Sequence, residues 1–310
     1  PKKTIPSLKG GFKEKIAIIG AGPAGLSCAY FLALTGYKPT IFEKNAEPGG
    51  MLRYGIPSYK LEKDLLAAEI DVLRQLGVEI RCGVEVGKDV TIEDLREQGY
   101  KGFYAAIGCQ RGRKPGISGE NAEGAYTAVD FLRKAGGSES FPLEGDVVVV
   151  GGGDTGNDCV GTCIRHGCRS MIQLEMMPCP PTERAENNPW PQWPKVLKTD
   201  YGQQEAIAVF GSDPRIYQTT VKEFYKDEAG QVCGALIAKL ESKVVDEATG
   251  RRAMVPTGEE FAIECDLVLI AAGFTGCQPY VAEAFGVDLT KRGTVADTKY
   301  ATNVPHVFTC

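Results

Sequence analysis

The sequence predicts an α/β protein with two Rossmann-like (βαβ) domains, the second of which is inserted in the first. The chain has 310 residues, which is too many for one ordinary hydrophobic core. Two glycine-rich turns, which begin at Gly20 and Gly151, each lie between a short apolar run and a helical pattern. The succession of strand, turn, helix and strand therefore occurs twice.

Composition excludes several classes of protein. Hydrophobic residues make up 43% and charged residues 24% of the chain, as in soluble globular proteins. A net charge of −5 gives no indication of a nucleic-acid partner, and no run of eighteen apolar residues could span a membrane. None of the eleven cysteines forms a C-x-x-C pair, so we expect no metal site within this chain. Reduced thiols in a cytoplasmic protein are the expectation.

One pair of cysteines has a spacing that occurs in redox proteins. Cys163 and Cys168 have the C-x4-C spacing of flavoprotein redox disulfides. They lie at the end of the helix that follows the second glycine turn, whereas such disulfides follow the flavin-binding turn. We therefore interpret them as ordinary thiols, partly buried.

The first βαβ unit is predicted in order from residue 15. Residues 15–19 form a buried strand, and the helix that follows has Pro23 near its first turn and Gly36 as its stop. Residues 38–44 form the second strand. Apolar spacing predicts the remaining elements, which are helices at 61–77, 91–99 and 127–137 and strands at 78–87 and 102–108.

The pattern restarts at Asp146. Residues 147–150 predict a strand, 154–167 a helix and 170–175 a strand, and further strands are predicted at 219–227, 235–245 and 261–273. Between them, residues 178–217 are rich in proline and contain both tryptophans, Trp190 and Trp193. This stretch is too long for an ordinary connection, so we expect a packed surface loop with a function.

These patterns divide the chain into domains. We predict an N-terminal linker at 1–14, a first domain at 15–145 to which residues 274–310 return, and a second domain at 146–273. The chain begins with Pro1 and ends directly after a short strand, so we expect a piece of a longer protein.

The first glycine turn predicts a dinucleotide site. Gly20, Gly22 and Gly25 fit G-x-G-x-x-G, in which the glycines allow a tight turn, approach of a pyrophosphate and packing of helix on strand. Glu43 ends the next strand, 23 residues after Gly20, where a carboxylate accepts hydrogen bonds from a ribose. A second glycine pair, Gly49 and Gly50, follows the acid. Bare backbone there suits the large flavin of FAD better than NAD.

The second turn repeats this geometry. Gly151, Gly153 and Gly156 have the same spacing, and Glu175 lies 24 residues after Gly151. Asp154 and Thr155 open the helix, where short polar side chains act as caps. A carboxylate such as Glu175 favours NADH over NADPH, and Met176 and Met177 follow it instead of arginines. Three arginines are close enough in sequence to bind a 2′-phosphate instead, namely Arg165, Arg169 and Arg184.

The motifs together resemble the small (beta) subunit of glutamate synthase and its relatives, which include the flavin-containing part of dihydropyrimidine dehydrogenase. "GGMLRYGIPSYKL" and "GGGDTGNDC" are shared across the group, whereas "ERAENNPWPQWPKV" is similar to the glutamate synthase branch. "DLVLIAAGF" near the end fits the same family.

The resemblance implies roles for residues at matching positions. Those implied for FAD lie in the first turn, around the acid and near the end of the first domain: Gly20, Gly22, Pro23, Ala24, Gly25, Leu26, Glu43, Lys44, Gly50, Met51, Leu52, Lys60, Val86 and Gly108. Those implied for NAD(P)H lie in the second turn and at its acid: Gly151, Gly152, Gly153, Asp154, Thr155, Gly156, Glu175 and Met176. Ala271, Ala272 and Gly273 are implied to lie near the bound cofactors. No acid, base or nucleophile is required, so we assign no catalytic residue.

The resemblance also implies a path for electrons. Hydride passes from NAD(P)H to FAD, and single electrons leave through 4Fe-4S clusters to an FMN on the large subunit, where glutamate is formed. The clusters belong to a cysteine-rich N-terminal domain outside this sequence. Two alternatives stay open, namely an oxidoreductase of the same family that reduces ferredoxin or another acceptor, and a nucleotide-binding module without turnover.

A Gly-Asp motif that encloses the flavin in this family would begin after Cys310. We therefore expect the 310-residue chain to bind NAD(H) better than FAD.

Overall fold

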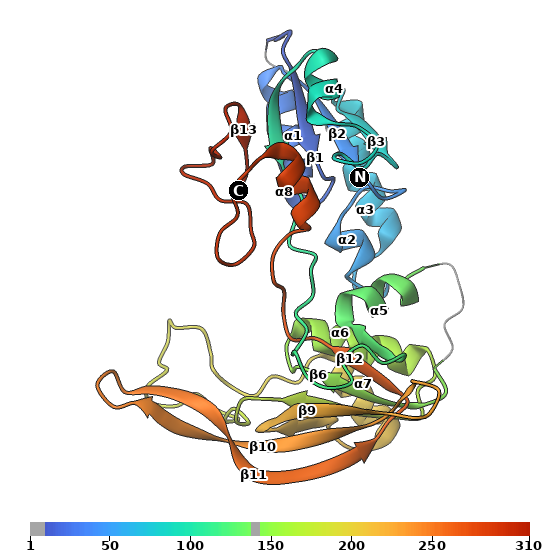
Figure 1. Cartoon of the computed structure of the whole chain (residues 1–310), viewed down its shortest axis with the longest axis vertical. Coiled ribbons are helices and arrows are strands. Elements are labelled where there is room, and N and C mark those ends of the chain that lie inside the picture. The colour runs from blue at the N-terminus through green and yellow to red at the C-terminus, as the bar shows by residue number, and fades with distance from the viewer. Residues whose placement is uncertain (1–9, 138–142) are drawn as a thin grey trace. The chain divides into compact units, whose positions relative to one another are not determined.

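The computed structural model describes residues 10–137 and 143–310, and the chain folds into two compact units (Figure 1). The first unit contains the chain up to Arg111 and the segment Phe274–Cys310, and the second contains Gly112–Gly273. The second unit thus interrupts the first, which confirms the predicted insertion. The proposed linker at 1–14 falls mostly outside the described residues.

The boundary between the units differs from the predicted one at residues 145 and 146. Residues 112–137 and 143–145 belong to the second unit. The reason is the short strand β5 (Ala125–Thr127), which pairs in parallel with β12 (Leu267–Ile270). Sequence reasoning missed β5 because three residues carry too little periodicity.

The first unit contains a five-stranded parallel sheet in the order β13-β4-β1-β2-β3. The strands are β1 (Lys15–Ile19), β2 (Lys38–Glu43), β3 (Glu79–Cys82), β4 (Tyr100–Ala105) and β13 (Val307–Phe308). The short apolar run at 15–19 lies in the middle of this sheet, where both faces are covered.

Helices cover both faces of this sheet. On one face, α1 (Pro23–Thr35) and α3 (Lys63–Gln75) bury residues such as Ala29, Ala33 and Leu73 against Ile18 and Ile41. On the other, α4 (Ile92–Glu97) and α8 (Pro279–Phe285) pack around Phe103. The small alanines of α1 allow the helix to approach the sheet closely. A single turn of helix, α2 (Met51–Tyr54), follows the second glycine pair.

The second unit repeats four strands of the first sheet in the same order, whereas its outer strand β5 comes first in the sequence and its counterpart β13 comes last. Its parallel strands have the order β5-β12-β6-β7-β8, with β6 (Asp146–Val150), β7 (Ser170–Glu175) and β8 (Arg215–Tyr217). β6 takes the place of β1, and β7 takes the place of β2. The two βαβ units predicted from the glycine turns are therefore confirmed.

The second unit has a different second layer. Helices α5 (Ala128–Ala135), α6 (Asp154–Arg165) and α7 (Tyr201–Phe210) cover one face of the parallel sheet. The other face packs on an antiparallel sheet, in which β10 (Val232–Asp246) lies between β9 (Thr219–Lys226) and β11 (Arg251–Glu264) (Figure 1).

Two predicted segments need correction. The strand predicted at 261–273 is two strands, because β11 ends at Glu264 and β12 begins at Leu267 in the other sheet. The loop predicted at 178–217 contains α7 and β8, and Asp200 caps α7 through a capping box. The two tryptophans are not packed, since Trp190 is 81% and Trp193 85% exposed.

The glycines where α6 meets β6 give a test of this architecture. A Cβ atom on Gly156 would lie 2.1 Å from the Gly151 carbonyl oxygen, whereas one on Gly153 would meet nothing within 4 Å. We predict that Gly156→Ala lowers the free energy of unfolding by about 1–3 kcal/mol, as overpacking does. Gly153→Ala is the matched control and should leave it nearly unchanged. Equal denaturant midpoints for both variants would contradict this account of the turn.

Candidate nucleotide-binding sites

The first glycine turn brings helix and strand into direct backbone contact. Gly20 has φ +106° and donates its N–H to the Phe42 carbonyl at 2.8 Å. A Cβ on Gly20 would lie 2.3 Å from the Ala106 carbonyl oxygen, and one on Gly25 would lie 1.9 Å from that of Gly20. No side chain can replace either hydrogen atom, so the spacing of the motif follows from packing.

Glu43 braces this turn from the end of β2. Glu43 is buried, with an exposed fraction of 4%. Its Oε2 accepts the Ala21 N–H at 2.8 Å. Oε1 accepts the backbone N–H of Asn45 at 2.9 Å and the Asn45 side-chain amide at 2.6 Å. The acid is therefore held beside the turn, where the sequence placed it.

The second glycine pair packs on the first turn. Gly49 donates its N–H to the Ala21 carbonyl at 2.8 Å. Gly50 has φ +53°, and a Cβ there would lie 2.7 Å from the Gly22 Cα. The two glycine segments thus present bare backbone to each other and to the adjoining space.

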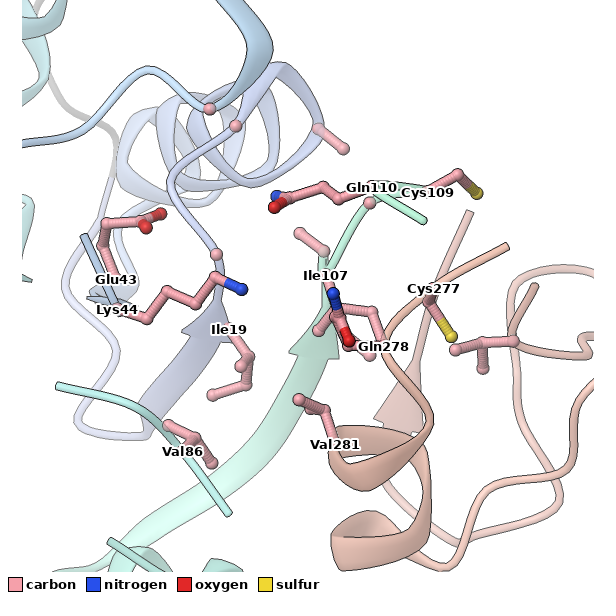
Figure 2. Close-up of a pocket in the computed structure, with 18 of the residues that line it drawn as sticks. Ile19, Glu43, Lys44, Val86, Ile107, Cys109, Gln110, Cys277, Gln278 and Val281 are labelled. Atoms are coloured by element: carbon pink, nitrogen blue, oxygen red, sulfur yellow. The ribbon is translucent and has the colours of Figure 1, made fainter. Parts of the chain in front are cut away.

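That space is a pocket of about 220 Å³ in the first unit (Figure 2). A buried water occupies roughly 30 Å³, so the pocket suits part of a larger ligand. Lys44 at the end of β2 extends into it, and Gln278 and Val281 face it from α8 (Figure 2). Ten predicted residues line the pocket: Gly20, Gly22, Pro23, Ala24, Glu43, Lys44, Gly50, Met51, Val86 and Gly108.

Four residues predicted for the first site do not line this pocket. Gly25 and Leu26 lie in α1 behind the turn, where Leu26 donates its N–H to the Gly22 carbonyl. Leu52 belongs to α2, and Lys60 is exposed just beyond it. Their predicted contacts with a flavin remain predictions.

Sequence reasoning missed the far wall of the pocket. Cys277, Gln278, Tyr280 and Val281 return to the first unit after the inserted one, so no local motif marks them. The Tyr280 hydroxyl donates to Glu85, and Lys88 pairs with the same carboxylate at 3.1 Å. The bond from Tyr280 lowers the pKa of Glu85, and Lys88 adds to this effect. Glu85 therefore places a carboxylate at the pocket.

The second turn has the geometry of the first. Gly151 has φ +123° and donates its N–H to the Leu174 carbonyl at 2.9 Å. A Cβ on Gly151 would lie 2.5 Å from the Ala271 carbonyl oxygen, the counterpart of the Ala106 contact in the first unit. Ala272 and Gly273 follow β12 at the same edge of the sheet, and Gly273 accepts the Arg113 N–H at 2.8 Å.

Glu175 lies against the second turn. A Cβ on Gly152 would fall 1.9 Å from Glu175 Oε2. Oε1 accepts the N–H of Met177 at 2.8 Å, as Glu43 accepts that of Asn45. Met176 is 50% exposed beside it. Both acids therefore end their strands in the same way, with one oxygen turned toward the glycines.

Neither α1 nor α6, the helices that follow the two glycine turns, has a side-chain cap. The N-cap residues of α1 and α6 are Gly22 and Gly153, and no side chain accepts their first N–H groups. The expectation that Asp154 and Thr155 cap α6 is therefore wrong, because both are already helical. Helices α4 and α7, by contrast, have capping boxes. Uncapped N-terminal amides with the positive end of the helix dipole bind anions such as a pyrophosphate.

The three arginines considered for a 2′-phosphate make other contacts. Arg165 pairs with Glu205 at the C-terminal end of α6, away from the turn. Arg169 pairs with Asp146 at the start of β6, on the opposite edge of the sheet. Arg184 donates to the carbonyls of Asn188 and Gln192 within its own loop.

The pair Cys163 and Cys168, considered above for its spacing, consists of free thiols. Both are buried, and burial raises the pKa of the Cys168 thiol to about 11. Burial also raises the pKa of Cys163 far above its usual range. Within residues 10–137 and 143–310, no three His, Cys, Asp or Glu side chains could hold a metal ion. No helix in these ranges is long and apolar enough to cross a membrane.

Two Rossmann-like units with matching glycine turns define the class of protein. The chain matches the pyridine nucleotide-disulphide oxidoreductase family over residues 14–310 and belongs to that family. Solved structures of the same fold include Mycobacterium tuberculosis FprA in complex with NADPH. Its TM-score is 0.72 at 18% identity, over 96% of this chain and 78% of that one. Lactococcus lactis thioredoxin reductase has a TM-score of 0.63 at 20% identity, over 96% and 89%.

Curated relatives indicate the branch of the family. The chain is 36% identical to the Saccharomyces cerevisiae protein named glutamate synthase [NADH], over 100% of this chain and 15% of that protein. It is 35% identical to the Bacillus subtilis glutamate synthase [NADPH] small chain, over 98% and 63%. It is also 35% identical to the Geobacter sulfurreducens NADPH-Fe(3+) oxidoreductase subunit beta, over 93% and 41%. The chain therefore spans less than two thirds of each relative, and the predicted resemblance to glutamate synthase small subunits is confirmed.

Proposed function

We propose that this chain is the NAD(P)H-oxidising flavoprotein part of a glutamate synthase. The observation that carries the proposal is the repeated site: an uncapped helix N-terminus beside a strand-ending glutamate, once in each unit. One site with a large adjoining pocket suits FAD, and the other suits a nicotinamide dinucleotide. The similarity to glutamate synthases from yeast and Bacillus supports the branch.

The residues of the first unit fit FAD. The amides at the start of α1 would bind the pyrophosphate, and the Glu43 carboxylate would accept hydrogen bonds from the adenosine ribose. Gly22 and Gly50 leave backbone bare on both sides of the approach, so the ligand need not displace side chains. When bound, the flavin accepts a hydride from a reduced nicotinamide and releases electrons singly. The protein's own contribution is to position the cofactors.

The second unit would hold NAD(P)H at Gly151–Gly156, with Glu175 beside the adenosine ribose. Electrons would leave through 4Fe-4S clusters of a cysteine-rich domain to the large subunit, where glutamate is formed. The similarity to an iron(III) oxidoreductase subunit favours one second candidate. In that function the same two sites would feed a different acceptor, such as ferredoxin.

The first test is spectroscopic. We predict that the full-length parent protein carries FAD and that NADH bleaches its visible flavin absorbance without oxygen. Glu43→Gln should lower FAD retention about tenfold or more, since a hydrogen bond from a ribose to a charged group contributes about 1.5–3 kcal/mol. Glu97→Gln, an exposed carboxylate on α4, is the control. A colourless protein that does not take up added FAD would refute the assignment.

The second prediction concerns NADH and NADPH. Glu175 Oε2 lies against Gly152, and a carboxylate there repels a 2′-phosphate. We propose that kcat/KM is higher for NADH. Glu175→Gln combined with Met176→Arg should shift preference toward NADPH by about tenfold or more, because a charged hydrogen bond contributes about 1.5–3 kcal/mol. Equal kcat/KM values for the two nucleotides in the unmodified enzyme would reject this proposal.

The third prediction concerns the tryptophan loop, residues 178–199. Trp190 and Trp193 are almost fully exposed, and such side chains often anchor interfaces. We propose that the loop borders the nicotinamide site and contributes to contact with the large subunit. Replacing both tryptophans with alanine should cost about 2 kcal/mol or more in assembly, measured by sedimentation, while nicotinamide affinity changes less. Phe31→Ala, which removes an exposed aromatic from α1, is the control. Unchanged assembly with full glutamate synthesis would remove the interface role.

A further inference from the structure

The repeat within the chain provides an internal comparison of the two turns. Gly20 donates its N–H to the Phe42 carbonyl, and Gly151 donates its N–H to the Leu174 carbonyl. The residues that precede Phe42 and Leu174 in their strands, Ile41 and Gln173, are therefore equivalent. Both have an exposed fraction of 0%. Ile41 shows that an apolar residue at this position supports a glycine turn. The buried glutamine in the second unit therefore has a reason other than the turn itself.

Gln173 is the middle of a chain of hydrogen bonds. Its Nε2 donates to the Gly151 carbonyl at 3.0 Å, within the second turn. Its Oε1 accepts from Nε2 of Gln203 in α7 at 3.1 Å. Oε1 of Gln203 in turn accepts the N–H of Asp200 at 2.9 Å. Three successive bonds thus connect the glycine turn to the N-cap of α7.

Asp200 is also where the tryptophan loop ends. That loop is internally fixed, because the buried Asn188 donates to the Trp193 carbonyl at 3.0 Å and accepts the Lys195 N–H at 2.8 Å. It continues into Asp200 and α7 without a break. A displacement of the loop therefore acts on Gln203, and through Gln173 on the turn.

The contact between α6 and α7 combines apolar packing around Ala206 with a polar contact in which one buried donor is unsatisfied. The Gln203 N–H donates to Asn157 Oδ1 at 3.2 Å. Asn157 is 2% exposed, and its Nδ2 has no hydrogen-bond partner among the residues that the structure describes. A buried unpaired donor is destabilising, so the polar part of this contact costs part of the free energy that the apolar packing provides.

We infer that Gln173 and Gln203 are positioning residues that couple dinucleotide binding at the second turn to the position of α7 and the tryptophan loop. The coupling involves two states of the second unit. In one state the three hydrogen bonds between Gly151 and Asp200 are intact, and in the other the bond between Gln173 and Gln203 is broken. A ligand that binds the turn amides favours one orientation of the Gly151 peptide, and hence one of these states. The coupling is reciprocal, so a partner on the loop alters nucleotide affinity. This inference rests on the proposed function of the second turn.

Intrinsic fluorescence tests the coupling, because both tryptophans of the chain lie in the loop. We expect NAD⁺ to change tryptophan emission in the wild-type protein, with affinity measured independently by calorimetry. In Gln173→Ile with Gln203→Leu, the emission change should disappear, while NAD⁺ still binds about two- to tenfold more weakly. The range corresponds to one net hydrogen bond. Replacing both partners with apolar groups should leave the fold intact, as Ile41 indicates.

Two further variants separate coupling from a general loss of packing. Gln204→Leu removes only a side-chain bond to the Thr199 carbonyl, so the emission change should persist. Gln203→Glu keeps the acceptor for the Asp200 N–H but loses the donor to Gln173, so the change should disappear even if the double variant fails to fold. NAD⁺ binding without an emission change in the wild type, or an emission change that survives Gln203→Glu, would overturn the inference. Absence of NAD⁺ binding to the wild type would instead refute the proposed function.

Discussion

The structure depends on one close contact, made twice, between the start of a helix and the strand before it. In each unit the third glycine of the motif lies so near the carbonyl of the first that no Cβ atom fits between them. This approach fixes the position of α1 and α6 against the strands before them, and the N-cap residues of both helices, Gly22 and Gly153, lie within the turns. The anion binding that we propose for each site would follow from the packing of its backbone. The strand-ending acids lie against the same turns, since Glu43 accepts the Ala21 N–H and a Cβ on Gly152 would meet Glu175.

The two units show how one arrangement can be adapted to different tasks. The first unit adds the glycine pair at Gly49 and Gly50 and a pocket that α8 completes. The second adds an antiparallel sheet, α7 and an exposed loop. The glycine turns and the acids hardly differ between them. The structural differences between the two sites therefore lie in the surroundings of the turn, where Ile41 is replaced by Gln173.

Sequence reasoning located the parts of the fold that depend on local periodicity. The strand at 15–19, the helix beginning at Pro23 and the strand ending at Glu175 have the predicted limits. Gly20 marks the end of the first strand, and Pro23 and Gly36 mark the limits of the helix. It did not find β5, β8 or α8, which are short and stabilised by distant partners. The strand predicted at 261–273 was wrong because two strands of different sheets follow each other with two residues between them. For the site, the glycines and acids were found, whereas Tyr280, Cys277 and the buried Gln173 had no motif to mark them.

The insertion has a consequence for the order in which the protein can be made. β13, which pairs with the outer side of β4, and α8, which covers one face of the sheet, both belong to the segment that follows residue 273. The second unit, Gly112–Gly273, is continuous in sequence, so it can fold as soon as it leaves the ribosome. The first unit has by then been synthesised as far as Arg111 but has one edge of its sheet and the apolar surface around Phe103 uncovered. The domain that begins first is therefore completed last, and its nascent form exposes the surface that chaperones recognise.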